Sequence, residues 1–136
     1  MSIAIIYWSG TGNTEAMAKA VQKGAGAGAQ LFSVADFDVS KADRYDAFAL
    51  GCPAMGSEEL ESTEFEPFFE AVKTTLAQKK VVLFGSYGWG DGEWMRSWEE
   101  SCADAGISLA ADSVICNDMP DDEALEACKA LGAALL

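Results

Sequence analysis

The sequence predicts a doubly wound three-layer α/β/α fold, in which helices cover both faces of a five-stranded parallel sheet. Three observations support this prediction: short apolar runs rich in branched residues, helix-like stretches that alternate with them, and a length of 136 residues. Alternating strands and helices favour parallel strands joined by right-handed crossovers. A chain of this length can bury one stable core, so we expect residues 1–136 to form a single domain.

Four apolar runs are nearly continuous rather than alternating, which is typical of strands covered on both faces. Each is interpreted as a central parallel strand, and together they occupy residues 3–7, 47–50, 81–84 and 113–116. A weaker run at residues 30–34 follows a stretch rich in glycine and alanine. We expect this run to be a fifth strand near an edge of the sheet.

Helix-like stretches lie between and after the apolar runs, at residues 14–23, 64–77, 92–105 and 121–135. The last one follows Pro120 and opens with acidic residues, as the start of a helix should. Ligands of doubly wound folds bind at the carboxyl ends of the strands. The loops that follow the predicted strands are therefore the place to look for a binding site.

The charge balance restricts the class of partner. Nine basic and 22 acidic side chains give a net charge of −13, and the chain has no histidine. This charge opposes binding to nucleic acid or to an anionic membrane, and it favours a basic protein partner.

Four cysteines form no C-x-x-C pair and are interpreted as reduced thiols: Cys52, Cys102, Cys116 and Cys128. Without a histidine to complete a zinc or iron-sulfur ligand set, we expect no metal site. The first residues, MSIAIIYW, lack a basic segment and a long apolar segment, so we expect a cytoplasmic protein. Because no helix-like stretch suggests a large exposed apolar face, we also expect a monomer.

The stretch SGTGNT, residues 9–14, follows the first strand and enters the first helix. Free backbone N–H groups and the positive end of the helix dipole make such a place an anion site, and a phosphate monoester fits it. The patterns G-x-x-x-x-G-K-[ST] and G-x-G-x-x-G are both absent, so neither ATP nor a dinucleotide is indicated. The alternative is a simple glycine turn with a helix cap.

Two further loops lie at the same edge of the predicted sheet: GCPAMGSEELE, residues 51–61, and GSYGWGDGEW, residues 85–94. Trp89 lies between Gly88 and Gly90, so its ring covers either a flat ligand or the core beneath the loop. The loop at residues 117–119 borders this edge too, but it is left outside the predicted site.

Taken together, YWSGTGNTE, LGCPAMGSEELE and LFGSYGWGDGEWM resemble, in order and spacing, the phosphate loop and the two flavin loops of short-chain flavodoxins. The chain is most similar to flavodoxins of clostridia and related anaerobes, and like them it lacks an insertion in the last strand. The resemblance implies strand order 2-1-3-4-5 with FMN bound between the first and third strands, an arrangement for which flavodoxin itself is the reference example.

The resemblance also implies a role for individual residues. Residues 9–14 surround the FMN phosphate and Ser86 adds a hydroxyl, while Met55 and Trp89 contact the two flavin faces. Glu58 accepts a hydrogen bond from the pyrimidine N–H of the flavin. Related chains often carry a hydroxyl residue at the position of Pro53, so no side-chain phosphate contact is expected there. The predicted cofactor-binding residues are Ser9, Gly10, Thr11, Gly12, Asn13, Thr14, Pro53, Ala54, Met55, Gly56, Ser57, Glu58, Ser86, Tyr87, Gly88, Trp89 and Gly90.

The function implied by the resemblance is low-potential transfer of single electrons between redox enzymes, without catalysis on a substrate. Its implied partners are enzymes with basic docking patches, such as reductases and ferredoxin-dependent oxidoreductases. The residues agree with a low potential, because a phosphate loop without cations in a protein of charge −13 makes an anionic reduced flavin costly. The five glutamates among residues 58–66 are candidates for this effect, although a solvated loop and helix start explain them equally well.

Other functions on this fold were weighed against the same residues. A small FMN-dependent NAD(P)H or quinone oxidoreductase needs a second pocket over the flavin, and the sequence shows no residue set for one. A phosphatase needs the motif C-x5-R, but no arginine occurs within ten residues after Cys52. A receiver domain needs adjacent acids where residues 7–9 read Tyr-Trp-Ser. A binding module for another phosphorylated aromatic compound is an alternative that the sequence leaves open.

The turn at residues 55–58 gives a testable prediction. If this turn resembles that of the family, the Gly56–Ser57 peptide rotates when the flavin gains an electron and a proton, and its carbonyl then accepts a hydrogen bond from flavin N5–H. A type II turn of this kind requires a positive φ at its third residue, Ser57, where a residue other than glycine costs on the order of 1 kcal/mol. We therefore expect Ser57→Gly to stabilise the one-electron reduced cofactor and to raise the first reduction potential. A redox titration checks this, and an unchanged or lower potential would contradict it.

Overall fold

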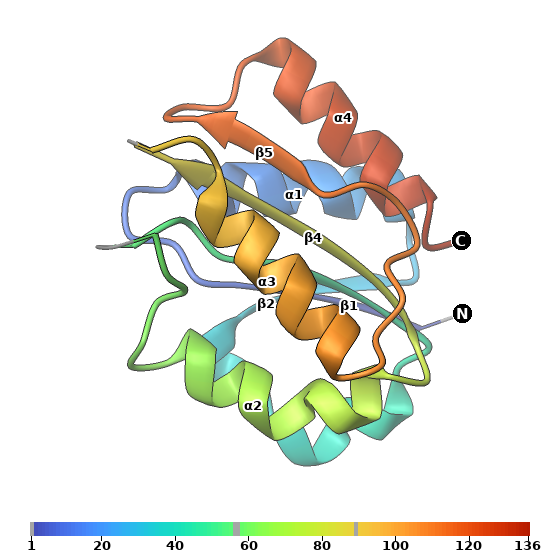
Figure 1. Cartoon of the computed structure of the whole chain (residues 1–136). Helices are drawn as coiled ribbons and strands as arrows, with labels where there is room; N and C mark the ends of the chain where they lie inside the picture. The colour runs from blue at the N-terminus through green and yellow to red at the C-terminus, as the bar shows by residue number, and fades with distance from the viewer. Residues whose placement is uncertain (1, 56–57, 89) are drawn as a thin grey trace.

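A five-stranded parallel sheet forms the centre of the structure, a computed structural model that describes residues 2–55, 58–88 and 90–136 (Figure 1). The strand order is β2-β1-β3-β4-β5, which confirms the predicted order. All neighbouring strands run parallel, and the strands are β1 (Ile3–Tyr7), β2 (Ala29–Ser33), β3 (Ala47–Gly51), β4 (Lys80–Tyr87) and β5 (Val114–Asn117).

Helices cover both faces of the sheet, and their bounds are α1 (Asn13–Ala25), α2 (Phe65–Leu76), α3 (Glu93–Asp104) and α4 (Asp122–Ala133). Helices α1 and α4 pack on one face, and α2 and α3 cover the other (Figure 1). Within the described residues, no helix combines the length and the apolar character that a membrane span requires.

Strand β1 shows how one short apolar run supplies both halves of the core. Ile3 and Ile5 belong to the cluster beneath α1 and α4, whereas Ala4 and Ile6 belong to the cluster beneath α2 and α3. All four side chains are fully buried. Side chains alternate across a strand, so a strand between two helical layers must be apolar at every position. The prediction of strands covered on both faces is confirmed for β1, β3 and most of β4.

The interpretation of residues 113–116 as a central strand, which rests on their apolar composition, is wrong, whereas the strand order implied by the resemblance places this strand at an edge, as observed. Strand β5 pairs only with β4 and forms an edge of the sheet. Its residues alternate between half-buried and exposed, and Ile115 is 38% exposed. An apolar run predicts a buried strand, but within the part of the chain that the structure describes β5 has a neighbouring strand on one side only.

The connection between β2 and β3 also differs from an ordinary crossover. It contains two short 3-10 helices, η1 (Val34–Asp36) and η2 (Val39–Arg44), in place of an α-helix. The predicted fifth strand therefore ends one residue early, because Val34 already belongs to η1.

The carboxyl ends of β1, β3 and β4 lie together at one end of the sheet, on the left in Figure 1, and both chain termini lie at the other end. Backbone hydrogen bonds also join the segments that follow these strands to the neighbouring strands. The Trp8 N–H donates to the Gly51 carbonyl at 3.0 Å, and the Ala54 N–H donates to the Ser86 carbonyl at 3.0 Å. The loops after these strands are thereby held side by side.

All four cysteines are free thiols, as the sequence predicted. Cys52, Cys102 and Cys128 are fully buried, and burial raises the pKa of each of these thiols to about 12. These three side chains therefore behave as small apolar core residues.

The carboxylate of Glu61 caps the start of α2. One oxygen accepts hydrogen bonds from the N–H groups of Glu64, at 2.8 Å, and Phe65, at 2.9 Å. The other accepts from the N–H of Thr63 at 2.9 Å and from the Thr63 hydroxyl. Burial alone raises the pKa of Glu61, but these hydrogen bonds outweigh it and lower the pKa to about 2. The charged form of Glu61 is therefore part of the fold.

This cap predicts a stability that depends on pH. The pKa of Glu61 is near 4.5 in the unfolded chain and about 2 in the folded one. Its contribution is therefore complete above pH 4.5 and is lost as the pH falls toward 2. We expect Glu61→Gln to lower the free energy of unfolding by about 1–2 kcal/mol near neutral pH, with a smaller difference in acid.

Urea unfolding at several pH values measures this difference. Glu100→Gln, at an exposed position of α3, is the matched control and should show little effect at any pH. Equal stability of Glu61→Gln and the parent at neutral pH would show that the charged cap contributes nothing.

Candidate cofactor-binding site

The loop at residues 9–14 connects the end of β1 to the start of α1 and turns its N–H groups inward. The Ser9 Oγ accepts hydrogen bonds from the N–H of Gly12, at 3.0 Å, and of Glu15, at 3.3 Å. Gly12 precedes the first residue of α1 and has φ of +96°, a conformation that strongly favours glycine. The glycine therefore makes the tight entry into the helix possible.

Donors in this loop remain available to a ligand. Among the described residues, the N–H groups of Gly10 and Thr11 have no acceptor. The side chains of Thr11 and Asn13 add a hydroxyl and an amide beside the positive end of the α1 dipole. This set of neutral donors is suited to an anion such as a phosphate group.

The loop opens onto a cavity of about 360 Å³ at the carboxyl edge of the sheet. Its volume lies within the range of roughly 300–1,000 Å³ that is usual for small-molecule sites. Residues from four separate segments of the chain meet there. Those already predicted from the sequence are Gly10, Thr11, Asn13, Pro53, Ala54, Met55, Ser86, Tyr87 and Gly88.

The cavity has two lining residues that the sequence analysis left out, Trp8 and Asp118. Trp8 directly precedes the phosphate loop, and its indole Nε1–H donates to Glu64 at 3.1 Å. Asp118 follows β5, and its N–H donates to the Tyr87 carbonyl at 2.7 Å. Both residues directly follow the carboxyl end of a strand, and this position in the sequence is a signal by which they could have been predicted as site residues.

Three predicted residues, Gly56, Ser57 and Trp89, lie outside the described residues, so their predicted roles stay predictions. The ends of the turn that contains Gly56 and Ser57 are described. Met55 and Glu59 exchange two backbone hydrogen bonds of 2.8 and 2.9 Å, which close the turn. Glu58, the last residue inside it, has φ of +57°.

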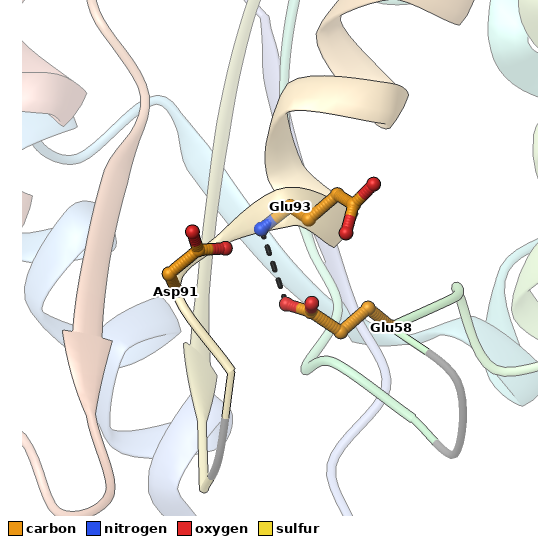
Figure 2. A group of neighbouring side chains, drawn as sticks. All are labelled: Glu58, Asp91 and Glu93. Carbon is orange, nitrogen blue, oxygen red and sulfur yellow. Dashed lines mark hydrogen bonds between the residues drawn. The ribbon is translucent and has the colours of Figure 1, made fainter.

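Glu58 connects two loops of the site. Figure 2 shows its carboxylate directed at the start of α3, where Oε1 accepts a hydrogen bond from the Glu93 N–H at 3.1 Å. Glu58 lines a second cavity of about 390 Å³ beside α3 and is absent from the lining of the first. A methyl group at Gly90 would approach the Glu58 carboxyl carbon to 2.6 Å, and Gly90 has φ of +87°. The carboxylate and the glycine therefore pack directly against each other.

Three acidic side chains give this end of the site a negative charge. The carboxylates of Glu58, Asp91 and Glu93 have oxygens within 4.8 Å of one another (Figure 2). Arg96 offsets part of this charge, because its guanidinium lies 3.0 Å from the Asp91 carboxylate and also donates to the Asp91 carbonyl at 3.1 Å. The α3 amide that binds Glu58 contributes a further positive dipole.

The residues present fit the phosphate ester of a flat aromatic compound. Neutral N–H and hydroxyl donors lie at one end of the cavity, and the side chains of Trp8, Pro53, Met55 and Tyr87 supply apolar walls. None of the described lining residues is a lysine or an arginine. The site is therefore suited to an anion held by dipoles, and it would leave most of the ligand's charge uncompensated.

Comparison with known proteins shows the family of the chain. The chain matches the Flavodoxin family over residues 5–132. It is 47% identical to the flavodoxin of Megasphaera elsdenii over 135 residues, covering 97% of this chain and 96% of that protein. It is 46% identical to the flavodoxin of Clostridium beijerinckii over 121 residues, covering 87% of this chain and 88% of the relative.

The structure is similar to the solution structure of two-electron reduced Megasphaera elsdenii flavodoxin, with a TM-score of 0.88 and 48% identity. The match covers 98% of this chain and 97% of the other. Flavodoxins are electron carriers rather than enzymes, and they bind FMN non-covalently. The site, the sheet order and these relatives lead to one conclusion: this chain belongs to the flavodoxin family, whose members transfer electrons through bound FMN.

Proposed function

We propose that this protein holds FMN in the 360 Å³ cavity and passes single electrons at low potential between redox enzymes. The observation that supports the site is the opening of an N–H-rich loop onto an apolar-walled cavity at the carboxyl edge of the sheet. Bound FMN supplies one-electron redox chemistry. The protein's own residues bind it, orient it and set the relative free energies of its redox states.

Each part of the cavity has a separate task in this proposal. The N–H groups of Gly10 and Thr11 hold the phosphate, with hydroxyls from Thr11 and Ser86. Met55 and Tyr87 bound the space for the ring. Glu58 lies outside the lining of this cavity, so it would accept the pyrimidine N–H of the flavin, through the oxygen that does not bind Glu93, where the ring extends from the cavity toward the start of α3.

The charge near the site is the proposed cause of a low potential. Adding negative charge to the flavin is disfavoured by Glu58, Asp91 and Glu93, which lie close together at one end of the site. One carboxylate about 10 Å from the ring contributes roughly 1.7 kcal/mol at an effective dielectric constant near 20. Glu61 contributes at most part of this effect, since α2 N–H groups already compensate its charge.

The protein is further proposed to act as one domain and as a monomer in the cytoplasm. Its partners are redox enzymes with basic docking patches, such as reductases and ferredoxin-dependent oxidoreductases. The net charge of −13 supports brief, salt-sensitive encounters with such patches. The alternative of a small FMN-dependent NAD(P)H or quinone oxidoreductase is not favoured, because the close relatives are electron carriers.

A titration of the cofactor-free protein with FMN, followed by visible absorption and flavin fluorescence, tests the proposed function. We expect one FMN per chain, and dithionite should then reduce the bound flavin in two steps. A protein that binds no FMN would overturn the proposal. Steady-state oxidation of NAD(P)H by the loaded protein would favour the oxidoreductase instead.

Asn13→Asp tests where the phosphate binds. The new carboxylate keeps the shape of the side chain but repels the phosphate, so we expect the Kd for FMN to rise at least about tenfold. An acidic residue in the first turn of α1 favours the helix, so the thermal midpoint of the cofactor-free protein should stay equal or rise. Isothermal titration measures the Kd, and riboflavin, which lacks the phosphate, is the control ligand. An unchanged Kd for FMN would show that the phosphate does not bind at this loop.

A pair of substitutions at Glu58 tests the bond between the two loops. Glu58→Gln keeps an oxygen that can accept the Glu93 N–H, whereas Glu58→Ala removes it. We expect Glu58→Ala to speed hydrogen exchange of the Glu93 amide by about tenfold in the cofactor-free protein, and Glu58→Gln to change it little. Equal exchange in both variants would show that the bond does not order the loops. Amide-resolved NMR provides the measurement.

A further inference from the structure

A pair of exposed apolar side chains lies beside the cofactor cavity, on the open edge of the sheet. Met119 is 76% exposed and Ile115 is 38% exposed. A groove of about 370 Å³ runs beside them, between β5 and the start of α4. We call Ile115, Met119 and this groove the β5 patch, and its remaining apolar lining consists of Val114, Ala124 and Ala127.

The β5 patch is joined to the cofactor cavity through one residue. Asp118, directly before Met119, lines the cavity, and its N–H bonds to the Tyr87 carbonyl at the end of β4. Ile115 lies against the start of α3, where a methyl group on Gly92 would come within 3.0 Å of its side chain. A protein seated on the β5 patch would therefore lie next to the bound flavin.

Acidic side chains surround the patch on the side of α4. Asp118, Asp121, Asp122 and Glu123 are all exposed. Asp121 caps α4 by accepting the Ala124 N–H at 2.8 Å, which fixes the start of the helix beside the groove. An apolar centre with a charged rim is the usual composition of a protein-binding surface.

The composition of the patch matches a transient interface with several partners. Single exposed apolar residues are ordinary on protein surfaces, but here two of them adjoin a groove and the cofactor site. Methionine is flexible and polarisable, so it adapts to partners of different shape. Electron-transfer encounters use small interfaces, below about 1,200 Å² in total, so one or two apolar contacts suffice.

We infer that the β5 patch is the docking surface for the redox partner. The occupant is a basic electron-transfer protein that brings a shallow apolar contact ringed by lysine or arginine. Met119 and Ile115 make the apolar contact, and the acidic rim steers the encounter. This inference rests on the proposed FMN site, because the patch matters only if the electron leaves from a flavin beside Asp118.

Electron transfer to cytochrome c, a basic protein with an exposed haem edge, tests the patch. In each encounter one electron leaves the reduced flavin of this protein and converts one ferric haem to ferrous haem. Stopped-flow absorption follows that reaction with the FMN-loaded protein. We expect Met119→Gln and Ile115→Gln to lower the second-order rate constant about fivefold at low ionic strength. Glu123→Gln should lower the rate at low but not at high ionic strength.

Val39→Gln is the matched control, since Val39 is 43% exposed but lies in η2, which follows the other edge strand. Its rate should equal that of the parent. The absorption spectrum should be the same in every variant, and the midpoint potentials should be the same in the variants that change no charge. Unchanged rates in Met119→Gln, or an equal loss in Val39→Gln, would overturn the docking surface while leaving the FMN site intact.

Two other results would also be decisive. Sedimentation that shows a dimer of the parent, converted to monomer by Met119→Gln, would assign the patch to a second copy of this chain. That result would overturn the docking inference. A parent protein that binds no FMN would overturn the proposed function, and the docking surface with it.

Discussion

Strand β1 is hydrogen-bonded on both sides, and the position of the candidate site depends on this constraint. Tyr7, its last residue, is in register with Ser33 of β2 and Gly51 of β3. The ladder extends one residue further, through the bond from the Trp8 N–H to the Gly51 carbonyl. The phosphate loop therefore begins from a fixed point in the middle of the sheet. A loop anchored in this way needs little ordering when it binds a ligand.

Two acidic side chains that are close in the sequence, Glu58 and Glu61, have different structural roles. Glu61 and Glu58 belong to the same acidic run, yet Glu61 is buried against the first turn of α2 whereas Glu58 reaches across to the start of α3. One carboxylate therefore stabilises the fold, and the other joins two loops beside the cavity. The cavity offers an anion neutral donors, and none of its described lining residues is a lysine or an arginine. With a net charge of −13 and no cation among these lining residues, the proposed site stays negative, which would disfavour an extra electron and attract the proposed basic partners.

Much of the fold follows from local sequence. The runs that became β1, β3 and β4 are apolar at successive positions, and only a strand between two helical layers needs that pattern. The predicted helices match the observed ones to within about two residues at each end, the usual uncertainty at helix ends. The edge position of β5 could not be read in the same way, because a short apolar run looks alike whether one neighbouring strand is present or two. The 3-10 turns between β2 and β3 had no periodic signal to reveal them.

The candidate site, like the fold, is predictable from local sequence only in part. Glycines and hydroxyl residues after β1 mark an anion loop, because the backbone conformations and donors they provide are local properties of the chain. The alternation of strands and helices along the chain likewise predicts that the other two loops lie at the same edge of the sheet, next to the first. Packing between segments that are distant in the sequence decides which side chains face the cavity. Trp8 and Asp118 line it, and Glu58 bonds to Glu93 thirty-five residues away. Local sequence therefore determines where a ligand binds, whereas contacts between segments remote in the chain determine the walls of the site, because those contacts exist only once the sheet has formed.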